Sequence, residues 1–493
     1  MSLSPLFRRK STLLAGVALS LVSSACASAP IASTGTPLTQ TERDQGAKAH
    51  PQLVAEFGGV ETGARAKYVE TVARNVAVHS GLSNAPGDFT VSLLNSSVNN
   101  AFAIPGGYVY VTRQLVGLMN NEAELAGVLG HEIGHVAARH SAKRQAKAQQ
   151  NALLGVLGQV LSGVVLGNSA LGQLGQKISS TVPQLVTLRY SRKQELQADD
   201  LGIRYLKGAS YDPRAMATLL ASLAAQNSLD AQLQGRDARM PEWASTHPDP
   251  ASRVKTALTK AAGAAGKTNR DAFLNQVNGI MYGDDPKQGM IEGRTFTHPE
   301  LRLAFDAPQG FYMANGTRAV SINGQGGQGQ MSSGPYSGDL EAYVRAAFNA
   351  LAGEGKTLAP TTMKRTTVNG LPAAYGQVRV NSGNGQVDAT VYAYEFAKDR
   401  AFHFVTVIPA GQSGVFDGMY NSMRRISASD AAAITPRRIE VVTVKAGDTV
   451  ASLARRMAFT DSQEARFRVL NALSSSDTVT PGQKVKIVVK TAS

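Results

Sequence analysis

The chain has 493 residues, of which 43% are apolar and 17% charged, a composition typical of globular proteins that excludes wholesale disorder. Its length predicts about three domains, and because it lacks a run of 18 or more strongly apolar residues we exclude a polytopic membrane protein. The 50 Lys and Arg residues outnumber the 36 Asp and Glu residues but are scattered along the chain, so we expect no nucleic-acid binding. The single cysteine, Cys26, excludes a disulfide framework and a thiolate zinc site.

The N-terminus carries the features of a secretory signal. Residues 8–10 are Arg-Arg-Lys, residues 11–22 form a short apolar run, and small residues follow up to Cys26. Two processing routes fit: lipidation of Cys26 as the mature N-terminus of a bacterial lipoprotein, or plain cleavage within the Ala-Cys-Ala sequence of residues 25–27. We predict a signal peptide over residues 1–25. The mature protein then faces the periplasm as an outer-membrane lipoprotein or, alternatively, as a soluble periplasmic protein.

Helical and strand-type segments alternate in blocks, which predicts a multi-domain fold. Helical periodicity dominates up to about residue 262, apart from one strand-like stretch at 108–112, and strand-type alternation dominates from about residue 288. We expect a mainly α domain with a small β-strand, then an α+β domain, then a small βααβ domain. The predicted units are a linker at 26–45, the α domain at 46–262, a linker at 263–287, an α+β domain of unknown role at 288–428, and the small domain at 437–490.

The chemistry centres on the sequence His131-Glu132-Ile-Gly-His135. Asn121 and Glu124 predict a capping box at the start of the helix that carries it. Four residues correspond to about 400° of helix rotation, so His131 and His135 project from one face within reach of a single ion. Glu132 lies to one side of that pair, where it can take a proton from water without being a ligand.

A third protein ligand must come from elsewhere in the chain. The metzincin pattern requires a glycine and a histidine where this sequence has Ala138 and Ser141, and His140 falls one residue early. We therefore take His140 for a surface or packing histidine. Glu195 and Asp199 share a face of a later predicted helix, so Glu195 can bind the metal while Asp199 holds a histidine N–H. Two histidines and one glutamate leave the fourth tetrahedral position open, which is the catalytic arrangement of zinc.

With these motifs in place, the chain resembles the M48 (HtpX-like) zinc metallopeptidases, and more closely their exported bacterial members of the BepA and LoiP type. The resemblance covers about residues 46–262 and rests on four stretches, namely 100–111, 131–142, 190–199 and 246–248. It implies a mainly α gluzincin-type domain that binds one Zn²⁺ through His131, His135 and Glu195. It also implies that Glu132 is the catalytic base.

The same resemblance implies two further groups of residues. Gly107, Tyr108 and Val109 open a short strand that in the family is an edge strand and pairs with the substrate backbone, a mode that tolerates many sequences; the alternative is an ordinary hairpin. His247 matches a family histidine that either plugs the metal site or contacts substrate, and Arg253 could stabilise an oxyanion or bind a substrate carbonyl. A loop that caps a helix is the structural alternative for His247.

Two other segments complete the predictions. Residues 148–176 carry no charge and several glycines, and they form either a lid over the site or a hairpin packed on the catalytic domain. Residues 439–489 resemble a LysM domain, which implies binding to peptidoglycan, with a degenerate, non-binding copy as the alternative.

We therefore predict a zinc-dependent endopeptidase of the bacterial envelope that hydrolyses misfolded or misassembled envelope proteins. A chaperone or assembly factor, or a peptidoglycan-binding scaffold, with a plugged metal site is the alternative. The expected partners are unfolded envelope proteins, peptidoglycan through the tail, and the membrane through the lipid anchor.

Overall fold

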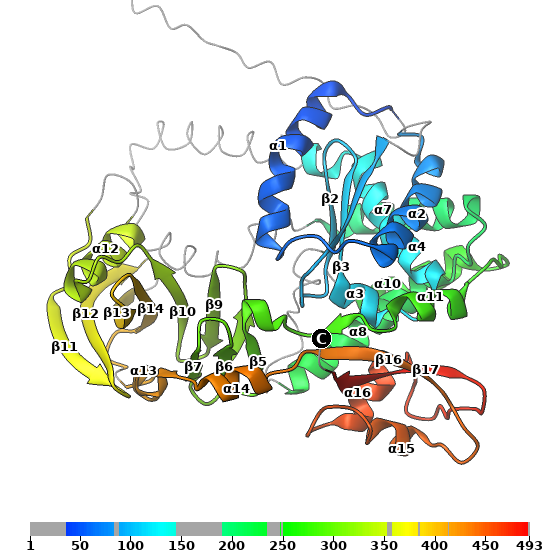
Figure 1. Cartoon of the computed structure of the whole chain (residues 1–493). Coiled ribbons are helices and arrows are strands. Elements are labelled where there is room, and N and C mark those ends of the chain that lie inside the picture. The colour runs from blue at the N-terminus through cyan, green and yellow to red at the C-terminus, as the bar shows by residue number, and fades with distance from the viewer. Residues whose placement is uncertain are drawn as a thin grey trace, which may run out of the picture.

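The fold is given by a computed structural model (Figure 1), which describes residues 36–82, 88–143, 190–233, 247, 250–352, 357–382, 385–412 and 414–491. The predicted signal peptide, the lipidation site Cys26 and the segment 148–176 lie outside these residues. None of the described helices is both long and apolar enough to cross a membrane.

The region before residue 278 is mainly helical. Its helices are α1 (Gln40–Glu56), α2 (Ala64–Ala77), α3 (Arg113–Leu118), α4 (Glu122–Ala137), α7 (Arg192–Gly208), α8 (Ala215–Leu233), α10 (Pro250–Ala261) and α11 (Arg270–Val277). Thr39 and Glu42 form a capping box that starts α1 inside the predicted linker 26–45. The last residues of that linker are therefore helical.

The second predicted linker, 263–287, is also wrong in part. It contains α11 and the short strand β4 (Met281–Tyr282), and Phe273 and Ile280 are fully buried. These residues join the same hydrophobic core as α2 and α4. The polar residues between the apolar ones hide this amphipathic helix in the sequence, because only one of its faces is buried.

A three-stranded sheet lies beside these helices. Strand β3 (Tyr108–Thr112) pairs in parallel with β1 (Thr90–Leu94) and antiparallel with β2 (Ala101–Ile104), so β3 is the central strand. The prediction of an edge strand at 108–112 is therefore wrong. The reason is a long-range pairing with β1, which a local sequence pattern does not reveal.

The predicted substrate-binding residues on β3 are accordingly engaged on both sides. Tyr108 lies between Thr90 and Ile104 in the sheet, Val109 is fully buried, and the carbonyl of Gly107 accepts a hydrogen bond from the Thr90 N–H. Among the described residues, the outer edge of β2 has no strand partner. Strand β3 therefore has no free edge to which a further strand could add.

The middle region contains two antiparallel sheets. The seven-stranded sheet has the order β11-β12-β13-β14-β10-β9-β8, and the four-stranded sheet has the order β15-β7-β6-β5. The strands are β5 (Met290–Glu292), β6 (Thr295–His298), β7 (Leu303–Asp306), β8 (Tyr312–Asn315), β9 (Ala319–Gly324), β10 (Gly327–Gly334), β11 (Thr362–Val368), β12 (Leu371–Ser382), β13 (Gly385–Ala397), β14 (Arg400–Pro409) and β15 (Arg424–Arg425). Helix α12 (Leu340–Ala352) packs on one face of the larger sheet, and the smaller sheet with α13 (Asp417–Ser422) packs on the other.

The tail follows a short helix, α14 (Ala428–Ala433). It has the expected order of strand, helix, helix, strand: β16 (Arg437–Thr443), α15 (Val450–Ala454), α16 (Gln463–Leu470) and β17 (Lys484–Lys490). Strand β4 adds a third strand to its sheet, in the order β17-β16-β4. The apolar side chains of the tail belong to one core with those of the N-terminal helices.

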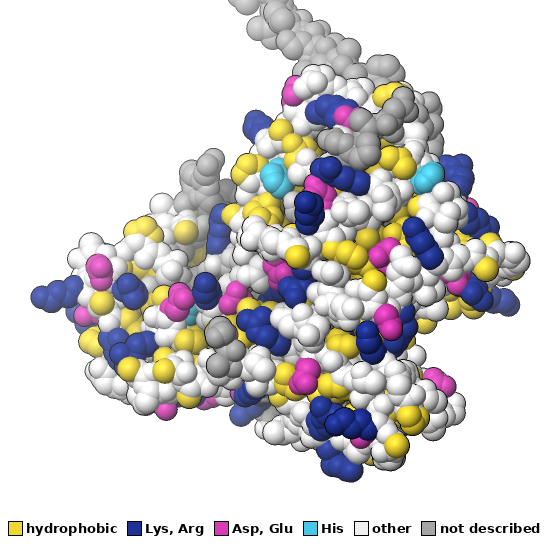
Figure 2. All heavy atoms as spheres, turned by 45° about the vertical axis from the view of Figure 1, so that its right-hand side comes forward, with side chains coloured by type: hydrophobic (Ala, Val, Ile, Leu, Met, Phe, Trp, Pro, Cys, Tyr) yellow, Lys and Arg dark blue, Asp and Glu magenta, His cyan; other side chains and the backbone are white. Residues whose placement is uncertain are grey.

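Lys and Arg side chains are spread over the whole face drawn in Figure 2, among acidic and apolar side chains. This matches the scattered distribution of basic residues in the sequence.

Candidate metal centre

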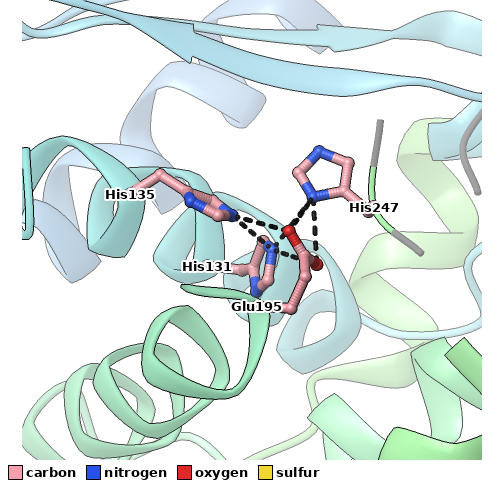
Figure 3. Close-up of side chains that lie close together, drawn as sticks. All are labelled: His131, His135, Glu195 and His247. Atoms are coloured by element: carbon pink, nitrogen blue, oxygen red, sulfur yellow. Dashed lines mark hydrogen bonds and ion pairs between the residues drawn. The ribbon is translucent and has the colours of Figure 1, made fainter. Parts of the chain in front are cut away.

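Four buried side chains from three parts of the chain meet at one point (Figure 3). They are His131 and His135 of α4, Glu195 of α7, and His247, which lies between α8 and α10. One ligand atom from each lies within 4.8 Å of those of the others, and the cluster can hold a metal ion.

Glycines bring α4 and α7 close enough for this meeting. A Cβ atom at Gly134 would lie 3.1 Å from the Ala198 carbonyl oxygen, and one at Gly202 would lie 3.1 Å from the His131 nitrogen. Side chains at either position would push the two helices apart. The Gly in the His-Glu-Ile-Gly-His sequence therefore sets the distance from the two histidines to Glu195.

The helix cap at the start of α4 differs slightly from the predicted capping box. The side chain of Asn121 accepts a hydrogen bond from the Glu124 N–H, as expected. The Glu124 carboxylate, however, accepts from the N–H of Asn120 rather than Asn121. The N-terminus of the helix that carries His131 and His135 is thus fixed by both side chains.

Hydrogen bonds at the far side of each ring orient the two histidines of α4. Nδ1 of His131 lies 2.9 Å from Asp199 Oδ1, and Nδ1 of His135 lies 2.8 Å from Nδ1 of His140. Nε2 of His140 in turn donates to Gln197 Oε1 at 3.1 Å, so His140 accepts the proton of His135 Nδ1. In the rings of both His131 and His135 the Nε2 lone pair therefore points to the centre, which is the arrangement that metal-binding histidines need.

His140 is the residue that sequence analysis missed. The prediction of a surface or packing histidine rests on its position one residue before that of the metzincin ligand. In a continuous helix a residue five positions after His135 would also point away from it. Helix α4 instead ends at Ala137, and Arg139 has a left-handed backbone with φ 51°. This turn brings the buried ring of His140 back to His135.

Glu132 is the buried carboxylate without a donor. Neither of its oxygens accepts a hydrogen bond from the described residues, and the nearest basic nitrogen, Nε2 of His247, lies 3.4 Å from Oε1. Burial raises the pKa of Glu132 to about 8. Buried carboxylate oxygens normally have partners, so this group is placed to accept a hydrogen bond from a small molecule such as water.

His247 and Arg253 both reach the cluster. Nδ1 of His247 lies 3.1 Å from Glu195 Oε1 and 3.3 Å from His131 Nε2, which puts it at the fourth position around the site. Arg253 donates to Asp199 through Nε and Nη2, at 2.7 and 2.5 Å, and to Glu195 through Nη1 at 2.6 Å. It thus orients two carboxylates, and the contact with an oxyanion or a substrate carbonyl stays a prediction.

These contacts set the charges of the site. Burial alone would raise the pKa of Asp199, but hydrogen bonds from Arg253 and His131 hold it at about 2. Burial would also raise the pKa of Glu195, but the three histidines hold it well below its ordinary value. Burial lowers the pKa of His135 well below its ordinary value, so that ring is neutral. A neutral imidazole and two ionised carboxylates suit a divalent cation.

Comparison with known proteins gives two family matches. Residues 63–261 match peptidase family M48, and residues 442–488 match the LysM domain.

Curated relatives share the first of these regions. The beta-barrel assembly-enhancing proteases of Escherichia coli O157:H7 and Yersinia pestis are 29% and 32% identical over 198 residues, which are 40% of this chain and 38% of each relative. The mitochondrial metalloendopeptidase OMA1 of Danio rerio is 34% identical over 196 residues, 39% of this chain and 40% of the relative. The chain thus matches less than half the length of these relatives. It carries a peptidase family M48 domain related to the beta-barrel assembly-enhancing and OMA1 proteases, followed towards its C-terminus by a LysM domain.

Proposed function

We propose that this protein is a zinc-dependent endopeptidase of the bacterial cell envelope. The observation that carries the proposal is the Glu132 carboxylate, buried without a donor beside the convergent histidine and glutamate atoms. Structural metal sites do not need such a group, whereas hydrolysis needs a base next to the metal.

The donor set fits zinc. Tetrahedral coordination at about 2.0–2.1 Å places the ligand atoms about 3.3 Å from one another. The Nε2 atoms of His131 and His135 are 3.0 Å apart, and they lie 3.6 and 3.4 Å from the nearer oxygens of Glu195. These three residues would hold the ion, with Asp199 and His140 fixing the histidine rings.

The chain's own residues supply the proton transfers. A bound zinc ion would act as a Lewis acid that polarises water and the peptide carbonyl. Glu132 accepts the proton of the attacking water at a carboxylate oxygen and then donates it to the leaving amine. Arg253 keeps Asp199 ionised and holds the carboxylates of both Asp199 and Glu195 in place through this cycle.

Strand β2 is the better candidate for holding the substrate backbone. It is an outer strand of its sheet and packs against α4, which carries the base. Asn100, directly before it, has a buried Oδ1 atom without a hydrogen-bond partner among the described residues. An extended substrate that adds to β2 can satisfy this acceptor while its carbonyl approaches the metal centre.

The two ends of the chain support a proposal for the location of the protein, and the names of its relatives support one for its substrates. The signal sequence and Cys26 support a lipoprotein on the periplasmic side of the outer membrane, and the LysM domain supports binding to peptidoglycan. The names of the bacterial relatives refer to β-barrel assembly, which supports misassembled outer-membrane proteins as substrates.

Two substitutions test the enzyme. Glu132→Gln keeps the size of the side chain but accepts no proton, so zinc should stay bound while casein cleavage falls at least about a hundredfold. Glu195→Ala removes a ligand and should lose both zinc and cleavage. Asp200→Asn, an exposed position on the same helix, serves as the control and should change neither. Cleavage by Glu132→Gln at the wild-type rate would overturn the mechanism.

Substitution of His247 tests whether its ring blocks the fourth position of the metal centre. Its ring fills the fourth position, so His247→Ala should raise the basal cleavage of an unfolded substrate if the ring blocks water. A fall in cleavage with unchanged zinc content would instead assign His247 to substrate binding.

A further inference from the structure

The middle region contains a groove whose lining residues are separate from those of the metal centre. It lies on the face of the seven-stranded sheet opposite α12, between strands β11 to β14 and helix α13, at the left of Figure 1. Its volume is about 740 Å³. Ligand sites for small molecules commonly have volumes of roughly 300–1,000 Å³, so the groove has the size of a binding site.

The floor of the groove is a row of hydrogen-bonding side chains. Thr362 of β11 lies opposite Gln377 of β12, which lies opposite Thr390 of β13, which lies opposite Thr406 of β14. Residues directly opposite one another in antiparallel strands project to the same face of a sheet. The hydroxyls of Thr390 and Thr406 are buried and already hydrogen-bonded, to Gln377 Nε2 and Tyr420 OH. The groups that a ligand can reach in this row are therefore the exposed side chains of Thr362 and Gln377.

A column of tyrosine rings forms one wall. Tyr375 stacks on Tyr392 with ring centres 5.0 Å apart, and Tyr392 stacks on Tyr420 at 4.7 Å. Tyr392 and Tyr420 are buried, whereas Tyr375, the outer ring of the column, is half-buried and lines the groove. It is held rigidly by the two rings behind it, and so costs little entropy when a ligand contacts it.

The groove has almost no uncompensated charge. Among its lining residues, Arg379 and Asp388 neutralise each other through two hydrogen bonds of 2.6 and 2.9 Å, and Asp417 is the other charged group. A phosphate or an acidic peptide would find no free cation at this surface. The lining therefore disfavours an anionic ligand, whereas an uncharged one needs no counter-charge from it.

The backbone excludes the usual way of binding an extended peptide. Strands β12, β13 and β14 each have a hydrogen-bonded neighbour on both sides, so no strand can be added above the floor. Recognition above β12, β13 and β14 must therefore come from side chains, and among the described strands that line the groove only the edge strand β11 leaves backbone groups without a strand partner. The half-buried ring of Tyr375 beside the exposed Thr362 hydroxyl and Gln377 amide matches the two surfaces of a sugar, since the apolar face of the sugar ring packs on the tyrosine and its hydroxyl groups meet the two polar side chains.

We propose that this groove binds an uncharged oligosaccharide, with one sugar ring on Tyr375 and neighbouring hydroxyl groups on Gln377 and Thr362. The site is separate from the LysM domain and does not depend on the metal centre, so it stands or falls independently of the peptidase proposal. The chain would then contact a glycan at two places.

The test is hydrogen exchange followed by mass spectrometry on the full mature chain, because it resolves the groove from the tail. The two probes are chitotetraose, which carries acetamido groups, and maltotetraose, which does not. We expect slower exchange in peptides that cover residues 372–380 and 414–421 when one of these sugars is added.

Substitutions assign the effect to the groove. Tyr375→Ala and Gln377→Ala should each raise the sugar concentration that gives half-maximal protection about tenfold. Thr367→Val and Gln386→Ala, on the same sheet but outside the groove, are the matched controls and should bind as the wild type does. Thermal melts of each variant verify that the sheet is still folded.

Three results would overturn the proposal. They are protection confined to the tail, protection in the groove that survives Tyr375→Ala and Gln377→Ala, and protection of the groove by an unfolded casein peptide but by neither sugar.

Discussion

The tail and the middle region are both attached to the peptidase region, but in different ways. The apolar side chains of the tail, among them Ile439, Phe467 and Ile487, belong to one continuous core with the helices around the metal centre. The middle region has two cores of its own, one on each face of its large sheet. The tail thus completes the peptidase fold, whereas the middle region has the internal packing of a separate unit.

The path of the chain explains this difference. Strand β4 leaves the peptidase region and pairs with β16, where the chain returns some 150 residues later, so the middle region is an excursion between two adjacent strands. Its contacts with the remainder are mainly polar, as in the hydrogen bond from Thr317 Oγ1 to the Glu56 carbonyl at 3.4 Å and the ion pair of Arg437 with Glu292. Order along the chain is therefore a poor guide to which parts fold together.

The largest expected effect comes from removing one part or the other. Deletion of residues 437–493 exposes the core at α3 and α11 and should unfold the peptidase region, because burial of each large apolar side chain contributes about 1.5–3 kcal/mol to a total stability of about 5–15 kcal/mol. Replacement of residues 290–433 by a short Gly-Ser linker should leave zinc binding and helix content intact. Circular dichroism melts and metal analysis of both variants make the comparison. A tail deletion that melts like the wild type would show that the shared core is unimportant.

Lys486 is the strongest polar contact between the tail and the peptidase region. Its buried ammonium donates to the carbonyls of Gly117, Leu118 and Met119, at 2.8, 3.1 and 2.6 Å, at the C-terminal end of α3. These carbonyls have no partner within the helix, so a side chain must satisfy them.

Lys486→Met keeps the volume but leaves the buried carbonyls of Gly117 and Met119 without this donor, while that of Leu118 still accepts from Asn120 Nδ2. We expect the free energy of unfolding to fall by about 3 kcal/mol, from an unsatisfied-group cost of about 1–3 kcal/mol each and partial compensation by water. Urea denaturation followed by circular dichroism measures the change. Lys484→Met, two residues earlier on β17, is the control: its ammonium pairs with the mostly exposed Asp271 and donates to Asn275 Oδ1 at 3.4 Å, so the expected change is below about 0.5 kcal/mol. Equal effects of the two substitutions would contradict the role of Lys486.

The sequence was sufficient for the parts of the site that depend on local geometry. The spacing of His131 and His135 places both rings on one helix face whatever the rest of the fold, and Glu195 and Asp199 follow the same rule on α7. The order of elements in the tail was also predictable, since each of its turns has its own sequence signal.

Features that depend on distant partners were not predictable. The central position of β3 requires its pairing with β1, and the burial of Lys486 requires the end of α3, hundreds of residues earlier. A lysine between apolar residues of a strand normally indicates a solvent-exposed face. The role of His140 depends on a single left-handed residue, Arg139, for which the sequence offers no glycine or asparagine as a signal.

Acid should lower the stability of the middle region more than that of the peptidase region. His403 is buried in the middle region, with Nδ1 2.8 Å from Tyr343 OH, and burial lowers its pKa to about 4. Between its ordinary value of 6.5 and 4, the unfolded chain binds a proton that the folded chain does not, so the stability is fully present above pH 6.5 and is lost as the pH falls.

From pH 7 to pH 5, protonation of the unfolded state should lower the stability of the middle region by about 2 kcal/mol. His403→Gln, which does not titrate, should remove that part of the pH dependence, although it lowers the stability at pH 7. Hydrogen exchange of peptides from β13 and β14 at the two pH values measures the effect, with peptides from α4 as the internal reference. An unchanged pH dependence in His403→Gln would rule out this residue as the cause.

The smallest effect tests how tightly the tail packs on α3. A Cβ atom at Gly117 would lie 3.0 Å from Cδ1 of Ile439 on β16, closer than ordinary van der Waals contact. In Gly117→Ala, the gain of about 1 kcal/mol in helix propensity is therefore offset by overpacking of about 1–3 kcal/mol. Ile439→Val removes Cδ1 and alone costs about 0.5–1.5 kcal/mol for the cavity it leaves.

The double substitution should be more stable than the sum of the single ones predicts, by about 1 kcal/mol, because the new methyl group occupies the space that Cδ1 vacates. Urea denaturation of the four proteins of this cycle measures the coupling. The pair Gly376→Ala and Ile439→Val is the control, since Gly376 lies on β12 in the middle region and contacts Pro360 and Phe348 instead. Its coupling should be zero if the middle region is the independent unit that its separate cores indicate, and a coupling as large as that of Gly117 would erase the distinction between the two regions.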